Sequence, residues 1–180
     1  MERFKNTYKI NSTRLQNWDY GWNGSYFVTI NTKEKEYYFG EIIGAKMILS
    51  EIGRVADQEW RLTPNIRPDM NIKLGVHVIM PNHFHGIIRI GENIFNRKYD
   101  QQSKQGRDAM HRVFTSHQFG PQRKNLSSII RGYKSVVTTY AKKHNIKFGW
   151  QISFYDRIIT DSVDYMKCEK YILNNPTNWK

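Results

Sequence analysis

The chain has 180 residues, and 28 Lys and Arg against 16 Asp and Glu give a formal net charge of +12. Hydrophobic residues make up 39% and aromatic residues 14%, which excludes a disordered chain and is enough to bury one core. A lone cysteine excludes an internal disulfide, and no apolar run suits a signal peptide or a membrane span. We therefore expect one cytoplasmic domain over residues 1–180, with a polyanion such as nucleic acid as its partner.

The first patterned segment is YFVTIN, residues 26–31, whose aromatic and β-branched side chains predict a strand. Residues from about Glu41 to Arg61 then carry apolar side chains at helical spacing. They predict a helix that ends at Thr63-Pro64.

A β-hairpin is predicted in the middle of the chain. NIKLGVHVIM, residues 71–80, predicts one strand, Pro81-Asn82 a tight turn, and FHGIIRI the partner strand. The stretch from about 91 to 124 is polar, basic and sparsely apolar, which predicts a long flexible loop.

Helical spacing returns in LSSIIRGYKSVVTTYAKKHN, and a short strand is expected at about 150–155. A last helix, from about Ser162 to Asn175, ends where Pro176 prevents its continuation. The predicted order β-α-β-β-α-β-α matches an α+β, ferredoxin-like fold, a βαββαβ antiparallel sheet with helices on one face, plus a C-terminal helix. Such a sheet leaves its second face for a ligand.

Two histidines, His83 and His85, stand two residues apart at the start of the predicted strand FHGIIRI. Side chains at this spacing point to one face of a strand, with Cα atoms about 6–7 Å apart, so both imidazoles can reach one divalent cation. Two buried structural histidines are the alternative, and the spacing does not decide between them. For His77, in the preceding strand, a structural role is favoured over one beside the metal ligands.

The last helix has an apolar arc on a helical wheel at about 100° per residue. The side chains in that arc are Val163, Tyr165, Met166 and Leu173. Tyr171 and Asn175 lie together on the opposite side, one turn apart. A core tyrosine belongs in the apolar arc, so both a packing role and a chemical role stay open for Tyr171.

MPNHFHGIIRI, WQISFYDRII and YILNNPTNW together resemble the single-tyrosine transposases of the HUH nuclease superfamily, closest to the REP-associated and related transposase-like proteins of bacteria. The resemblance covers the chain from YFVTINTKEKEYYFGEI to its end. In that superfamily two histidines flank a bulky hydrophobic residue, as His83 and His85 flank Phe84 here.

The resemblance implies metal-dependent transesterification on single-stranded DNA at hairpin-associated sites, through a 5′-phosphotyrosine intermediate. His83 and His85 would bind Mg²⁺ or Mn²⁺, and Tyr171 would be the nucleophile. Asn175 takes the position of a third metal ligand, where many relatives have Gln. Tyr155 is the competing nucleophile.

The partner implied is single-stranded DNA folded as a palindromic hairpin, bound by a monomer or a homodimer. The candidate DNA contacts are basic residues in or just before the second long helix, for each of which a solvated charged surface is the alternative. They are Arg123, Lys124, Arg131, Lys134, Lys142 and Lys143. A DNA- or RNA-binding module that no longer cuts is the main alternative function. A replication initiator of the superfamily and an unrelated metallohydrolase are disfavoured by chain length and by charge.

Overall fold

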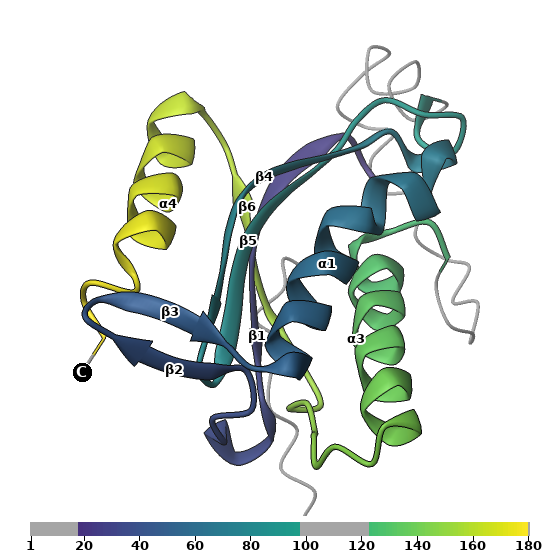
Figure 1. Cartoon of the computed structure of the whole chain (residues 1–180). Coiled ribbons are helices and arrows are strands. Elements are labelled where there is room, and N and C mark those ends of the chain that lie inside the picture. The colour runs from purple at the N-terminus through teal and green to yellow at the C-terminus, as the bar shows by residue number, and fades with distance from the viewer. Residues whose placement is uncertain (1–17, 98–122, 180) are drawn as a thin grey trace, which may run out of the picture.

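The computed structural model describes residues 18–97 and 123–179, and its centre is a four-stranded antiparallel sheet (Figure 1). The strand order is β4-β5-β1-β6. The strands are β1 Gly24–Asn31, β4 Ile72–Met80, β5 His83–Ile90 and β6 Tyr155–Ile159. Helix α1 (Glu51–Ile66) connects β1 to β4 in the chain, and α3 (Leu126–Lys143) connects β5 to β6. This order and pairing confirm the predicted ferredoxin-like fold.

Helices cover both faces of the sheet, as Figure 1 shows. Helices α1 and α3 pack on one side, the core face, and α4 (Ser162–Asn174) packs on the other, the α4 face. Because side chains alternate along a strand, β5 sends Phe84 to the core face and Ile87 to the α4 face. The single strand β5 therefore serves two different layers.

The core face holds the largest buried rings. The ring centroids of Trp60 (α1) and Phe84 (β5) are 4.6 Å apart, and Tyr133 (α3) lies 5.5 Å from Trp60 and 5.7 Å from Phe84. The α4 face has a smaller cluster of buried side chains. Its members are Phe27, Ile87, Ile159, Cys168 and Ile172. Most of the apolar stabilisation therefore lies under α1 and α3.

The predicted helix over residues 41–61 is wrong in its first part. Residues 40–49 form a separate hairpin, β2 (Gly40–Ile43) with β3 (Lys46–Leu49). Its two-residue turn places Gly44 and Ala45 at positive φ, 56° and 61°, as hairpin turns require. Helix α1 begins only after Ser50, whose side chain accepts a hydrogen bond from the backbone N–H of Gly53.

Two further boundaries differ from the prediction. Helix α1 continues past Pro64 to Ile66, because a proline in the last turn removes only one helical hydrogen bond. The strand expected at 150–155 begins where it was expected to end, at Tyr155. Trp150 makes only an isolated bridge to Thr32, and its indole N–H donates to the backbone oxygen of Lys134.

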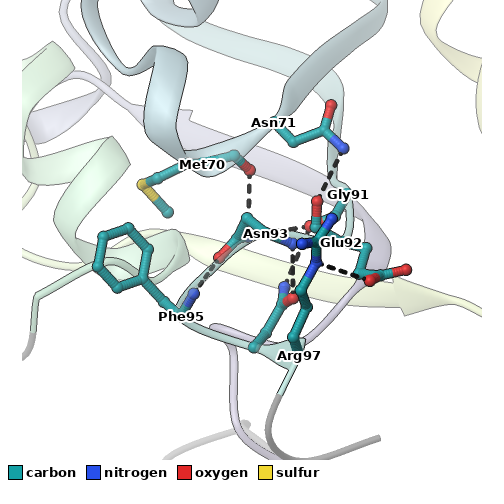
Figure 2. A network of polar contacts seen from close by, with 8 residues as sticks. Met70, Asn71, Gly91, Glu92, Asn93, Phe95 and Arg97 are labelled. Atoms are coloured by element: carbon teal, nitrogen blue, oxygen red, sulfur yellow. Dashed lines mark hydrogen bonds and ion pairs between the residues drawn. The ribbon is translucent and has the colours of Figure 1, made fainter.

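The predicted loop at 91–124 is ordered where it begins. Figure 2 shows Asn93 at the centre of a polar network just after β5. Its side-chain amide donates to the backbone oxygens of Gly91 and Met70, and its Oδ1 accepts from the N–H of Phe95. The rest of that loop, residues 98–122, lies outside the described residues.

Among the described helices, none has both the length and the apolar character that crossing a membrane demands.

Candidate functional site

The structure places both histidines of the HFH segment on the α4 face. In the antiparallel register His83 pairs with Asn31 of β1, and His85 pairs with Thr29. The two imidazole centroids are 4.5 Å apart with their planes at 70°. His85 is buried, whereas His83 is half-buried. The rings are therefore close enough to share one ligand.

Each imidazole is anchored through its Nδ1 atom. The Nδ1 of His83 lies 2.7 Å from Oδ1 of Asn82, and the Nδ1 of His85 lies 2.8 Å from Oγ1 of Thr29. An amide oxygen can only accept, so the Nδ1–H of His83 donates and its Nε2 keeps a lone pair. This arrangement is typical of histidines that bind a metal through Nε2.

Neither anchor was predicted from the sequence, although both residues stand in recognisable positions. Thr29 is in YFVTIN, where strand alternation places Phe27, Thr29 and Asn31 on one face. Asn82 is the residue directly before His83. What the sequence alone did not supply is the pairing of β1 with β5.

Tyr171 of α4 lies directly over the buried histidine. Its hydroxyl is 3.4 Å from Nε2 of His85, and the two rings meet edge to face with centroids 5.2 Å apart. Phe27 stacks on His85 at 5.3 Å and contacts Tyr171 at 5.9 Å. The Tyr171 side chain is still 54% exposed. A buried imidazole and a solvent-accessible phenol therefore share one end of the α4 face.

Helix α4 packs through a different side than the helical wheel predicted. Cys168 and Ile172 are buried against the sheet, and Tyr171 lies on that same side. Three of the four side chains in the expected apolar arc are exposed, namely Val163, Met166 and Leu173. The fourth, Tyr165, packs against the sheet. The prediction failed because the packing side includes the polar residues of the site. Cys168 and Ile172, which are one helical turn apart, pack against Phe27 and Ile87.

The helix approaches the sheet closely at one glycine. A Cβ atom on Gly75 of β4 would lie 2.6 Å from the Tyr165 hydroxyl and 3.0 Å from Cβ of Ile87. The absence of a side chain at this position lets α4 lie near β4.

Asn175 follows α4 as its C-cap residue. Burial lowers the pKa of His83, a hydrogen bond with the Asn175 side chain partly offsets this, and the charge of Lys35 lowers the pKa further. The predicted third ligand thus reaches one of the two histidines. The side-chain nitrogen of Asn175 also lies 3.4 Å from the backbone oxygen of Tyr171.

Burial also keeps the second imidazole neutral. It lowers the pKa of His85 from its usual 6.5 to about 3, with a smaller contribution from His83. A neutral imidazole is the form that binds a metal. Within residues 18–97 and 123–179, no cluster of three or more His, Cys, Asp or Glu could hold a metal ion. The two imidazoles with an amide suit a cation that also takes oxygen ligands from a substrate, and do not suit a structural zinc with four protein ligands.

Two other residues considered from the sequence lie elsewhere. Tyr155 is on the α4 face, directly across from Thr29 in β1, and is 47% exposed. His77 points to the core face, where its Nε2 lies 2.8 Å from Oδ1 of Asp57 in α1. That contact ties β4 to α1, in keeping with a structural role.

The six candidate DNA contacts lie in or just before α3, in the layer on the other side of the sheet from His85. Arg131, Lys134 and Lys142 line an open groove between α3 and residues 149–152. The Nζ of Lys134 donates to the backbone oxygens of Gln151 and Ile152. Lys124 pairs with Asp69, while Arg123 and Lys143 are exposed. The structure gathers three of the six in one groove and brings none to the histidine pair.

Comparison with known proteins places the chain in a family. A protein of Haemophilus influenzae, described only as uncharacterized, is 36% identical over 170 residues, 94% of this chain and 89% of that protein. The chain belongs to that protein's family. No family model matches the sequence.

A solved structure shares the fold. The structure of a REP-associated tyrosine transposase bound to a REP hairpin superposes with a TM-score of 0.56 over 92% of this chain and 73% of that one. The two sequences are 16% identical, so the likeness concerns the fold.

Proposed function

We propose that the protein is a transposase-like enzyme that cuts and rejoins single-stranded DNA by transesterification through Tyr171. The observation that carries this proposal is the 3.4 Å approach of the Tyr171 hydroxyl to Nε2 of the buried His85. An accessible phenol beside two neutral, anchored imidazoles has no evident packing purpose. The fold shared with a REP-associated tyrosine transposase and the net charge of +12 support the choice of DNA as substrate.

The bonds that change in this reaction belong only to the tyrosine and the phosphodiester. The Tyr171 oxygen forms a bond to phosphorus, the bond from phosphorus to the 3′ oxygen breaks, and a 5′-phosphotyrosine link results. The phenol loses one proton and the released 3′-hydroxyl gains one, so the exchange balances. Rejoining is the reverse step and needs no nucleotide cofactor, because the phosphodiester is conserved in the link.

The two histidines and Asn175 are the proposed holders of Mg²⁺ or Mn²⁺. A free tyrosine has a pKa near about 10 and is a weak nucleophile at neutral pH. The cation would neutralise the phosphate and stabilise the charge that develops on its oxygens. Asn82 and Thr29 hold the two imidazoles through their Nδ1 atoms, and Nε2 of His85 faces the Tyr171 hydroxyl.

The hydrogen bond between Tyr171 and His85 defines the resting arrangement. With the phenol donating to Nε2, the Nδ1–H of His85 donates to Thr29, so one tautomer satisfies both contacts. Phe27 supports both rings from one side. The side chain of Tyr171 is thereby positioned before substrate binds.

Hairpin-forming single strands are the proposed substrate, since the solved relative in fold was bound to a REP hairpin. The groove formed by Arg131, Lys134 and Lys142 is a proposed contact for the DNA backbone. A monomer or a homodimer would carry out the reaction.

A nicking assay tests the proposal. Wild-type protein with Mn²⁺ or Mg²⁺ should nick a labelled single-stranded hairpin, and His83→Ala and His85→Ala should each abolish nicking while DNA affinity stays within about twofold. His144→Ala is the matched control, because His144 is exposed at the end of α3 and away from the sheet. Full nicking by the double variant would refute the metal role. Tight DNA binding without nicking, by wild type with either cation, would favour a binding module that no longer cuts.

A further inference from the structure

Beside the histidine pair runs a chain of aromatic contacts that the proposed chemistry does not use. The ring of Trp179, after α4, lies 5.8 Å from the ring of His83 and 5.7 Å from the ring of Tyr37. Tyr37 precedes the β2–β3 hairpin and is 61% exposed. The contacts thus lead outward, from His83 through the half-buried Trp179 to the exposed Tyr37.

Packing of the core does not account for the exposed ring. The neighbours Tyr38 and Phe39 both turn inward, and each contacts Phe148. Tyr37 instead meets Trp179 at an interplanar angle of 62°, an edge contact that leaves the face of one ring open. An exposed tyrosine held in place by a tryptophan is a fixed flat surface.

The turn before Tyr37 carries charges of both signs. The lysines Lys33 and Lys35 alternate with Glu34 and Glu36, and all four side chains are exposed. Lys33 pairs with Glu34, whereas the charge of Lys35 acts on His83. Aromatic faces with lysines beside them are the features with which proteins hold unpaired nucleobases and their phosphates.

We infer that Tyr37 and Trp179 form a stacking platform for an unpaired nucleobase of the DNA strand that enters the His83–His85–Tyr171 site. The inference rests on the proposed function, because it takes single-stranded DNA as the substrate. Trp179 fixes Tyr37, the base stacks on the Tyr37 ring, and Lys35 lies near the adjoining phosphate. The platform holds the strand beside the nucleophile and requires the base to be unpaired.

Equilibrium binding tests the platform without any cleavage. Fluorescence anisotropy in the presence of EDTA would compare an oligothymidine with an abasic strand of the same length. Tyr37→Ala should weaken binding of oligothymidine by about fivefold or more and leave the abasic strand unaffected. Tyr37→Phe keeps the ring and should keep the affinity.

Controls separate stacking from loss of structure. Phe95→Ala removes another exposed ring and should not change the affinity for either strand. Phe95 follows the C-terminal end of β5, whereas His83 begins that strand. Trp179→Ala should weaken oligothymidine binding in the same direction as Tyr37→Ala. Tighter binding by Trp179→Ala would mean that the ring covers the site, and would overturn the inference. Equal loss on both strands, or no loss with Tyr37→Ala, would overturn it as well.

The outcome is independent of the nicking assay. If Tyr37→Ala weakens oligothymidine binding and the wild-type protein never nicks DNA, the platform is supported and the proposed cleavage is refuted. If the wild-type protein nicks DNA through Tyr171 and Tyr37→Ala binds both strands as tightly as wild type does, the cleavage is supported and the platform is refuted.

Discussion

The two faces of the sheet differ in what their side chains do, although the same strands build both. On the core face, Phe84 packs against Trp60 and Tyr133, and these two rings also contact each other. On the α4 face, the next residue of β5, His85, meets Thr29 and Tyr171 through polar atoms. Period-two alternation thus separates stability from chemistry along one strand. The site can be polar because the opposite face supplies most of the apolar burial.

The largest stability effect is expected on the core face. Phe84→Ala should lower the free energy of unfolding by about 3–5 kcal/mol, because Phe84 is fully buried and a cavity would remain. Tyr171→Ala on the α4 face should cost at most about 1 kcal/mol, since that side chain is half exposed. Urea denaturation followed by circular dichroism measures both. Equal losses would contradict the division between the two faces.

The anchors behind the histidines should control metal affinity more than stability. Thr29→Val keeps the β-branched shape and removes the hydroxyl that meets Nδ1 of His85, so Mn²⁺ affinity should fall about 10–100-fold. Thr29→Ser should retain most of the affinity. Isothermal titration calorimetry with Mn²⁺ measures it, and an unchanged value for Thr29→Val would show that the anchor has no such role.

The buried imidazole should make the protein sensitive to acid. Between pH 7.5 and 5 the unfolded His85, with a pKa near 6.5, takes up a proton that the folded side chain, with a pKa of about 3, does not. Stability therefore falls as pH falls below about 6.5, and His85 alone contributes a loss of about 2 kcal/mol by pH 5. His85→Gln should lose that much less over the same range in urea denaturation. Parallel pH profiles for the two proteins would show that His85 does not titrate this way.

The smallest effect concerns the basic groove on the core side. Lys142 lines the groove and Lys143 does not, although they are adjacent in sequence and both exposed. If the groove contacts DNA phosphates, Lys142→Ala should reduce the slope of log affinity against log salt by about 1, and Lys143→Ala should not. Identical slopes for wild type and Lys142→Ala would place the DNA elsewhere.

The sequence predicted the layers of this fold better than it predicted the packing of single side chains. The hairpin β4–β5 was predictable because apolar strands flank Pro81-Asn82, and the last helix because Pro176 follows it. The β2–β3 hairpin was missed, since Gly44 at its turn stands in a stretch whose apolar residues also fit a helical period. The side of α4 that packs was also missed, because Cys168 and Ile172 are the residues buried over Phe27, whereas Val163, Met166 and Leu173 are exposed.

The candidate site was predictable only in part for the same reason. His83 and His85 could be placed on one face from their spacing alone. Their distance to Tyr171 depends on α4 crossing the α4 face, and no local pattern encodes that contact. Thr29 becomes relevant only because β1 pairs with β5 in the register that places Thr29 opposite His85.

The covalent link between protein and DNA is the most direct test of the central claim, that Tyr171 attacks the phosphate. Wild-type protein incubated with a single-stranded hairpin and Mn²⁺ should give an adduct that survives denaturation, and mass spectrometry should locate the nucleotide on Tyr171. Tyr171→Phe should form no adduct and lower the free energy of unfolding by at most about 1 kcal/mol, because the ring stays and only the hydroxyl with its long contact to Nε2 of His85 is lost. Tyr155→Phe, the matched control on the same face, should still form the adduct. An adduct on Tyr155, or DNA cutting with no adduct at all, would contradict the account.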